Sequence, residues 1–410
     1  MLGKARGGEV EIGKVNFSEL DCTFGGKIGV AELDNPASLN ALTLDMLKQL
    51  KAKLEQWESN EHIVCIFLHS VGDKAFCAGG DVRTMYQMMH AASELKEPAD
   101  DAAKNFLTDY FTVEYGCDYL IHRYSKPVIV WGEGIIMGGG MGLYIGASHR
   151  VTTPSSRLAM PEISIGLYPD VGGTWFLNHL PSGIGLFLGL TGAQLNASDA
   201  LGLELTEHVL MPAEKQLVLD KLQGSTWLVG EDNHSLNDAQ NDAKSHTQNH
   251  TQNHAIITEL LRGQEQAAIS HYPASQMNPY YSQILAACIG SSLAEVYRQI
   301  EAINGVGRWL EQAKKTLREG SSISASICFR QITQYQHLSL EDCFRLELSL
   351  SVRSGLLGEF EEGVRARLID KCGQPNWMYR TPEDVEQSVI DALFTSLWTE
   401  QEHPLAKLGT

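Results

Sequence analysis

Three glycine-rich segments in the first half of the chain limit the folds that it can adopt. Two of them follow continuous apolar runs at residues 63–68 and 128–131, which is the pattern of strands covered on both faces. The segments span residues 74–81 (KAFCAGGD), 137–142 (MGGGMG) and 160–173 (MPEISIGLYPDVGG). Glycine at the junction of a strand and a helix lets the backbone adopt a positive φ and approach a ligand closely. We therefore expect strand–helix units around a buried sheet.

The rest of the first half fits this α/β organisation. Residues 27–33 have the pattern of a short strand that ends at the turn signal before Pro36. Residues 43–57 carry apolar side chains at spacings of three and four, which predicts one helix with Thr43 as its N-cap.

The composition becomes polar beyond this half. Residues 230–254 end in His246, His250 and His254, whose spacing of four could place metal ligands on one face of a helix. A solvated loop or helix end is the more common role of such a tract, so we predict no metal site.

Helical patterns dominate the segments that follow, at residues 256–261, 293–317 and 338–357. We therefore predict three parts of the chain: a core domain over residues 1–229, a polar linker or insertion over residues 230–255, and a helical C-terminal domain over residues 256–410.

Charge and cysteine usage narrow the class of protein. With 32 basic and 50 acidic residues the net charge is −18, which argues against nucleic acid or an anionic membrane as the main partner. The eight cysteines form no CxxC pair, as expected of reduced thiols. We find no secretory signal and no run of about 18–20 apolar residues, so we expect a cytoplasmic protein without a membrane span.

The first two glycine-rich segments can supply backbone amides to a ligand. Amides at the start of a helix point outward with partial positive charge, and two such turns side by side can form an oxyanion hole. Tight helix–strand packing is the alternative role of these glycines. Neither segment has the GxGxxG spacing of a dinucleotide site.

The third segment supplies carboxyl groups. Glu162 and Asp170 lie eight residues apart among small and apolar residues, each directly after a proline. Such surroundings raise the pKa of a carboxyl group, which suits a general acid or base near neutral pH. Helix capping is the alternative role, above all for Asp170.

Taken together, these segments resemble the crotonase superfamily, the enoyl-CoA hydratase/isomerase family. The resemblance rests on residues 35–36, 39–42, 76–81, 138–140 and 161–173. It implies an α/β fold with a ββα spiral core, followed here by a mostly helical C-terminal region. It also implies a CoA thioester ligand and an oxyanion hole made by the amides of Ala78 (or its neighbour Gly79) and Gly139.

Individual positions then favour one reaction within the family. Hydratases of this family use a glutamate three residues after the middle glycine of the triplet, where this chain has Gly142, and a second glutamate that corresponds to Glu162. The run at residues 169–173 is similar to the 3-hydroxyisobutyryl-CoA hydrolase branch, in which Asp170 replaces a glycine of the hydratases. Residues 321–324, 329–331 and 360–371 resemble the helical extension of that branch.

The same branch implies the roles of the site residues. Its acyl-binding glutamate lies 25 positions before the oxyanion glycine, which corresponds to Glu114. The resemblance implies that Glu162 either activates a water molecule or attacks the thioester carbonyl itself. Asp170 would bind the substrate hydroxyl or give a proton to the leaving thiolate. Glu114 would bind the same hydroxyl. Glu114, Gly139, Glu162 and Asp170 would therefore contact the substrate.

These considerations predict a thioester hydrolase that acts on a short 3-hydroxyacyl-CoA, in valine breakdown, and that needs no cofactor or metal. An enoyl-CoA hydratase or isomerase on the same fold is the main alternative, and a CoA-binding protein without catalysis is another. The sequence leaves the oligomeric state open: proteins of the core family often form trimers, which would make this chain a homo-oligomer, whereas the helical extension could cap that interface. Lys74, Arg83 and Lys126 lie near the motif loops and are candidates for the CoA phosphates.

Overall fold

The computed structural model describes residues 13–95, 99–229 and 239–410 of the chain, and two sheets form its centre. The larger sheet has the strand order β1 (Lys14–Asp21), β2 (Lys27–Asp34), β3 (Ile63–Ser70), β5 (Val128–Gly132), β7 (His149–Thr152) and β10 (His208–Val209). The smaller sheet has the order β4 (Ala75–Cys77), β6 (Ile135–Met137), β8 (Arg157–Ala159) and β9 (Leu195–Asn196). Apart from the pairs β1–β2 and β8–β9, neighbouring strands run parallel.

The strands expected from the apolar runs occur where the sequence predicts them, as β2, β3 and β5. The helix α1 (Leu44–Glu58) follows β2, and its N-cap is Thr43 as expected, because the Thr43 side chain accepts a hydrogen bond from the amide of Met46 at 3.2 Å. The remaining helices of the first half are α2 (Val82–Leu95), α3 (Ala99–His122), α4 (Gly139–Ile145), α5 (Gly173–Phe176), α6 (Ile184–Thr191), α7 (Ala197–Gly202) and α8 (Lys215–Gln223).

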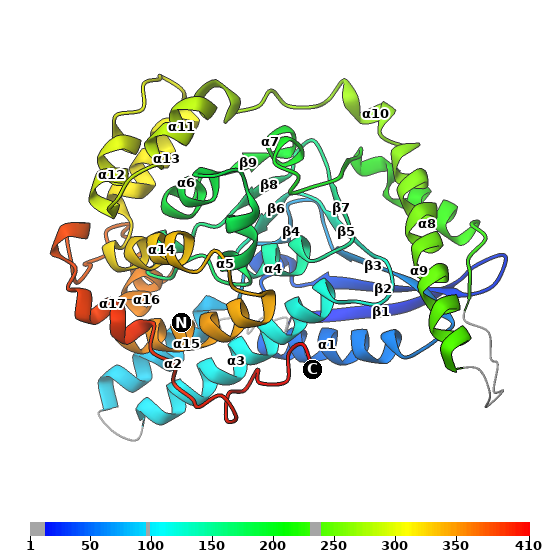
Figure 1. Cartoon of the computed structure of the whole chain (residues 1–410), viewed down its shortest axis with the longest axis horizontal. Coiled ribbons are helices and arrows are strands. Elements are labelled where there is room, and N and C mark those ends of the chain that lie inside the picture. The colour runs from blue at the N-terminus through cyan, green and yellow to red at the C-terminus, as the bar shows by residue number, and fades with distance from the viewer. Residues whose placement is uncertain (1–12, 96–98, 230–238) are drawn as a thin grey trace, which may run out of the picture.

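Helices cover both faces of the larger sheet (Figure 1). On one face α1 packs against β1 and β2, with α3 beyond it. On the other face α8 and α9 (Ala239–Arg262) contribute Val218, Leu222, Ile257 and Leu261 to a second apolar cluster. The core therefore lies on both sides of the parallel strands, as their continuous apolar runs require.

Part of the predicted polar linker or insertion is helical, because residues 239–262 form the single helix α9. Its C-terminal turns are held on the sheet by buried Ile257 and Leu261 and by His254, whose ring stacks on that of His149 at 5.4 Å. The side chains of His246 and His250 lie outside the described residues. Among the residues that are described, no group of three or more His, Cys, Asp or Glu side chains is arranged to hold a metal ion.

The C-terminal half is helical, as predicted, and consists of α10 (Gln266–Ile269), α11 (Tyr281–Ala287), α12 (Leu293–Glu301), α13 (Arg308–Glu319), α14 (Ser322–Gln334), α15 (Leu340–Leu357), α16 (Glu359–Val364) and α17 (Gln387–Leu393). The segment 293–317 is two helices, with a break that contains Gly305 and Gly307. At either glycine a Cβ would overlap the ring of Tyr280.

These helices share their apolar core with the first half of the chain. One cluster of buried side chains joins residues of α1, α3 and α4 to Ile323 of α14, Leu348 of α15 and Phe360 of α16. Figure 1 shows α15 lying along α3 and the path from α10 to α13 arching over the smaller sheet. The helical half is therefore built onto the α/β core, while the domain boundary itself stays a prediction.

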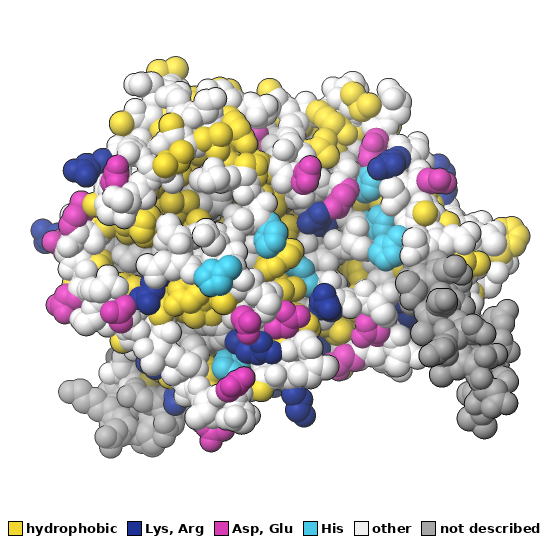
Figure 2. Space-filling view, in the orientation of Figure 1, with side chains coloured by type: hydrophobic (Ala, Val, Ile, Leu, Met, Phe, Trp, Pro, Cys, Tyr) yellow, Lys and Arg dark blue, Asp and Glu magenta, His cyan; other side chains and the backbone are white. Residues whose placement is uncertain are grey.

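Two further observations concern the distribution of charged side chains on the surface and the state of the cysteines. On the face seen in Figure 2, Lys and Arg side chains are interspersed with Asp and Glu side chains. All eight cysteines are free thiols, and only Cys372 is exposed. Within the described ranges, no helix combines the length and the apolar character that crossing a membrane requires.

Candidate active site

The first two glycine-rich segments form adjacent turns at the ends of β4 and β6, which pair in parallel. Gly79 has a φ of 125° and Gly138 a φ of 52°, conformations that side chains rarely adopt. The buried amide of Asn40 holds the first turn in place, since it donates to the carbonyls of Val71 at 3.1 Å and Ala75 at 2.8 Å. The two turns are thus brought together by the smaller sheet, as the sequence suggested.

The prediction that the Ala78 amide serves the oxyanion hole is wrong. This N–H donates to the carbonyl of Leu39 at 3.0 Å, and the N–H of Gly79 faces the sulfur of Cys77 at 3.4 Å. Sequence alone could not show these bonds, because they depend on how the turn crosses residues 39–42.

The amide of Gly80 is the one that remains available in this turn. Gly80 forms a parallel bridge with Leu42, in which Leu42 bonds to the carbonyl of Gly79 and to the amide of Asp81, each at 2.9 Å. This pairing leaves the N–H of Gly80 on the opposite side, and within the described residues no acceptor is recorded for it.

Gly139, the other glycine that the resemblance implies, also has an available amide. It is the first residue of α4, so its N–H has no partner within the helix. The nitrogen of Gly80 lies 3.3 Å from the position that a Cβ on Gly139 would take. The two free amides are therefore neighbours, and they can both donate to one carbonyl oxygen.

A cavity of about 210 Å³ contains the predicted site residues. Glu114, Glu162 and Asp170 line it together with the glycines of both turns. The apolar part of the wall comes from Val82, Met85, Phe111, Ile165, Leu167, Phe360 and Leu368. Since Phe360 and Leu368 belong to the C-terminal region, that region completes the cavity.

Glu162 begins the 3₁₀ helix η2 (Glu162–Ile165), directly after Pro161, and is 4 % exposed. Its Oε1 lies 3.1 Å from the position of a Cβ on Gly138, and its Oε2 has no hydrogen-bond partner among the described residues. Burial raises the pKa of Glu162 well above its ordinary value, and the nearby Asp170 raises it further. This carboxyl group therefore has the surroundings that the sequence predicted.

Asp170 also lines the cavity, and burial raises its pKa to about 7. Its Oδ2 lies 2.8 Å from the hydroxyl of Tyr115, a residue of α3 that the sequence analysis missed. The next residue, Val171, has a φ of 51°, which is strained for a β-branched side chain. The buried carboxylate of Glu347 holds this turn, since it accepts hydrogen bonds from the amides of Gly172 at 2.7 Å and Thr174 at 2.8 Å.

The helix α3 supplies two further carboxyl groups. Glu114 is buried, and a Cβ on Gly139 would overlap its Oε1. One turn later, Asp118 lies over Gly142, with no hydrogen-bond partner for either oxygen among the described residues. Burial raises the pKa of both groups well above their ordinary values. The sequence analysis missed Asp118, although its spacing of four from Glu114 places both on one helix face.

The cations named for the CoA phosphates differ in their surroundings. Lys126 is committed to the end of α1, because its Nζ donates to the carbonyls of Trp57 at 2.8 Å and Asn60 at 2.5 Å. Lys74 and Arg83 are exposed and remain candidates.

A second and larger cavity, of about 630 Å³, adjoins the first and shares Pro161 and Ser164 with it. Its wall includes the cations Arg308, Lys315 and Arg367.

Several known proteins are similar to this chain in sequence. A family model described as enoyl-CoA hydratase/isomerase matches residues 28–394. A curated protein of Danio rerio, named 3-hydroxyisobutyryl-CoA hydrolase, mitochondrial, is 32 % identical over 97 % of this chain and 92 % of its own. One of the same name from Xenopus tropicalis is 32 % identical over 93 % of this chain and 90 % of its own.

A solved structure shows a similar fold. The crystal structure of an enoyl-CoA hydratase from Rhodobacter sphaeroides 2.4.1 has a TM-score of 0.74 and 26 % identity, and the match covers 93 % of this chain and 97 % of that one. The spiral α/β core with a helical C-terminal region is therefore confirmed.

Proposed function

This chain belongs to the enoyl-CoA hydratase/isomerase family, and on that basis we propose that it hydrolyses 3-hydroxyisobutyryl-CoA to 3-hydroxyisobutyrate and CoA. One observation carries the proposal: the buried carboxyl groups of Glu162 and Asp170 face one cavity that two free amides also line. The names of relatives that match over more than nine-tenths of the chain support the same reaction.

In this reaction the thioester carbonyl lies against the amides of Gly80 and Gly139. Both hydrogen bonds strengthen as negative charge develops on the carbonyl oxygen. A good donor of this kind contributes roughly 3–4 kcal/mol to stabilising the transition state.

Glu162 then acts on the carbonyl carbon by one of two routes. Either it takes a proton from a water that attacks, or its own carboxylate attacks and water later cleaves the mixed anhydride. In both routes the bond between carbon and sulfur breaks, and the thiolate takes a proton to leave as CoA. Asp170 is placed to give that proton or to bind the 3-hydroxyl group, and Glu114 can bind the same hydroxyl.

The nucleotide end of CoA fits the larger cavity. Three cations, Arg308, Lys315 and Arg367, line it together with a single carboxylate, Glu319, which lies 3.4 Å from Arg367 and 3.9 Å from Lys315. An excess of cations in a chain of net charge −18 suits a group that carries phosphates. Arg308→Ala is therefore expected to raise KM with little change in kcat.

A hydratase with displaced acids is the second candidate. The observation that favours it is the carboxyl group of Asp118 over Gly142, because hydratases need a second carboxyl group near this position. Against it, Asp118 does not line the cavity that contains Glu162.

The wider setting of the reaction is also a proposal. The substrate places this step in valine breakdown, and eight free thiols suit a reducing compartment such as the cytoplasm. Relatives are named mitochondrial, so cell fractionation is the test of location. We propose that amides and carboxyl groups suffice without a cofactor, that activity therefore survives exhaustive chelation, and that the protein is a homo-oligomer.

Isotope incorporation tests the proposed reaction. In water enriched in oxygen-18, hydrolysis places labelled oxygen in the carboxylate of the released acid, with equimolar free CoA. In a single turnover, label found in Glu162 itself would identify the anhydride route. A product that keeps its thioester bond would overturn the proposal.

A further inference from the structure

A line of four short oxygen–oxygen contacts connects Asp170 to the C-terminal helix α15. Oδ2 of Asp170 lies 2.8 Å from the hydroxyl of Tyr115, which lies 2.6 Å from that of Ser351. The Ser351 hydroxyl lies 2.6 Å from that of Tyr168, which lies 2.8 Å from the backbone carbonyl of Glu347. All five residues are buried, so water does not compete for these contacts.

The direction of these hydrogen bonds is forced from one end. The carbonyl of Glu347 can only accept, so Tyr168 must donate to it. The Tyr168 oxygen must then accept from Ser351, and the Ser351 oxygen must accept from Tyr115. Tyr115 has now used its only hydrogen, so the fourth contact needs a hydrogen from Asp170.

Counting hydrogens gives the same result. Four contacts need four hydrogens, and the three hydroxyl groups supply three. If Asp170 were ionised, one pair of oxygens would face each other at 2.6–2.8 Å without a hydrogen between them, which is unfavourable in a buried site.

We propose that Tyr115, Ser351 and Tyr168 are positioning residues that keep Asp170 protonated and aimed at the cavity as the acid that protonates the leaving thiolate. This inference rests on the proposed hydrolysis. Helix α15 of the C-terminal half would then influence the protonation of Asp170, through a chain of hydroxyl groups that ends at the backbone carbonyl of Glu347.

Acidic side chains surround Asp170 and disfavour a negative charge on it. The ionisable side chains recorded near it are Glu114, Tyr115 and Asp118 on α3, Glu162 on η2, Tyr168 on its own loop, and Glu347 on α15. All six are acids, and a negative charge on any of them disfavours a second charge on Asp170. Burial raises the pKa of Asp170 to about 7, although hydrogen bonds to its ionised form from Tyr115 and from the backbone would each lower it.

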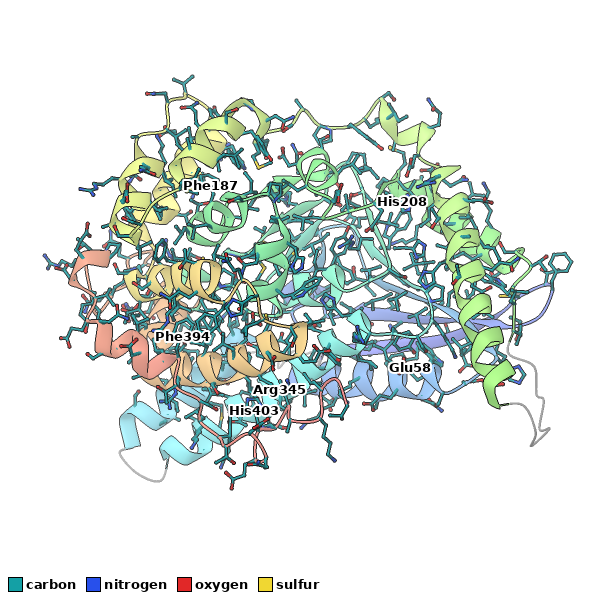
Figure 3. All side chains as sticks on the ribbon, in the orientation of Figure 1. Glu58, Phe187, His208, Arg345, Phe394 and His403 are labelled. Carbon is teal, nitrogen blue, oxygen red and sulfur yellow. The ribbon has the colours of Figure 1, made fainter. Side chains whose placement is uncertain are left out.

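The helix α15 is itself fixed in place. The guanidinium group of Arg345 donates to the carbonyls of Leu405 at 3.2 Å and Leu408 at 2.5 Å, and the ring of His403 meets the Arg345 carbonyl at 3.1 Å. Figure 3 shows Arg345 and His403 side by side where the C-terminal segment crosses this helix. Ser351 is thus presented by a helix that is anchored on both the core and the C-terminal segment.

The proton balance of the step is complete. Water adds to the carbonyl carbon and its proton goes to Glu162, the carbon–sulfur bond breaks, and the proton of Asp170 goes to sulfur. A proton then passes from Glu162 to Asp170, which restores both groups before the next turnover. On the anhydride route, the same exchange follows hydrolysis of the anhydride.

Two variants test the proposal through the pH profile of kcat/KM for thiol release. In Ser351→Ala the Tyr115 hydrogen is free to donate to an ionised Asp170, so the basic limb shifts down by about one pH unit. In Tyr115→Phe the protonated Asp170 loses the acceptor of its hydrogen, so the pKa of Asp170 falls and the basic limb also shifts down. Ser354→Ala removes a buried hydroxyl of the same helix that has no partner among the described residues, and it should leave the profile unchanged.

An upward shift in Tyr115→Phe would mean that Tyr115 donates to an ionised Asp170 and would overturn the proposal, as would no shift in either variant. Infrared difference spectra of the free protein provide a second readout that needs no turnover. They should show a protonated carboxyl band at neutral pH that Asp170→Asn removes and Ser351→Ala weakens. Absence of this band would refute the inference, whereas its presence without any thiol release would refute only the proposed function.

Discussion

Oδ2 of Asp118 lies 2.5 Å from the position that a Cβ atom on Gly142 would take. Glycine at 142 is therefore required by packing, because the space over it is filled by a carboxyl group from α3. Residue 142 itself carries no carboxyl group, as the sequence shows, but the carboxyl group of Asp118 occupies the space beside it. A buried carboxyl group is present there, outside the lining of the cavity.

This relationship predicts a coupling between the two positions. Gly142→Ala should destabilise the protein by about 1–3 kcal/mol, because its methyl group collides with Asp118. Combined with Asp118→Ala, the same substitution should cost much less. Urea unfolding of the wild type, both single variants and the double variant measures the coupling, and purely additive effects would show that the two residues do not collide.

The pH dependence of stability provides a test of the buried proton on Asp118. Burial raises its pKa well above 3.8 in the folded state, so the unfolded chain releases this proton first as pH rises. The free energy of unfolding therefore falls above pH 3.8, by about 1.4 kcal/mol for each unit of pKa difference.

Asp118→Asn is neutral at every pH and removes this contribution. Its stability relative to the wild type should rise steadily between pH 4 and 8, while any fixed cost of the amide stays constant. A stability difference that does not change with pH would mean that Asp118 is ionised in the folded protein.

Removal of either catalytic carboxyl group should abolish most of the activity. Glu162→Gln and Asp170→Asn are each expected to lower kcat at least about a hundredfold, with circular dichroism unchanged. Glu359→Gln alters a buried carboxyl group outside the cavity and serves as the control, which should keep most of its turnover. Near-normal turnover in either of the first two variants would remove that residue from the mechanism.

The assignment of the Gly80 amide can be tested by moving it. A Cβ on Gly80 would lie 2.6 Å from the hydroxyl oxygen of Tyr110, so Gly80→Ala should displace the turn and lower kcat about a hundredfold. Tyr110→Phe in the same chain removes that oxygen and should restore part of the activity. Gly202→Ala adds a methyl group with no neighbour within 4 Å and is the matched control. If Gly80→Ala were as active as this control, the assignment would fail.

The strands and the helix near the site were predictable wherever a local residue pattern determines the secondary structure. Continuous apolar runs predicted β3 and β5, and the spacing of apolar residues predicted α1 with its cap at Thr43. The residue pattern selected Glu162 and Asp170, and the resemblance to the hydrolase branch added Glu114; all three line one cavity in the structure.

What failed depends on contacts between distant segments. The sequence does not show whether the backbone amide of Ala78 or that of Gly80 is free to bind a ligand. Only the bridge between Gly80 and Leu42 shows that the Gly80 amide is the free one. Ser351 lies more than two hundred residues from its partner Tyr115, and no local pattern connects them. Polar composition also does not show that the C-terminal turns of α9 pack on the sheet through Ile257 and Leu261.

Thiol release from 3-hydroxyisobutyryl-CoA, with crotonyl-CoA alongside in the same assay, tests the central claim most directly. We predict rapid release of free CoA from the hydroxy substrate, with crotonyl-CoA unchanged. Loss of the crotonyl double-bond absorbance without thiol release from either substrate would contradict this account and would make the protein a hydratase.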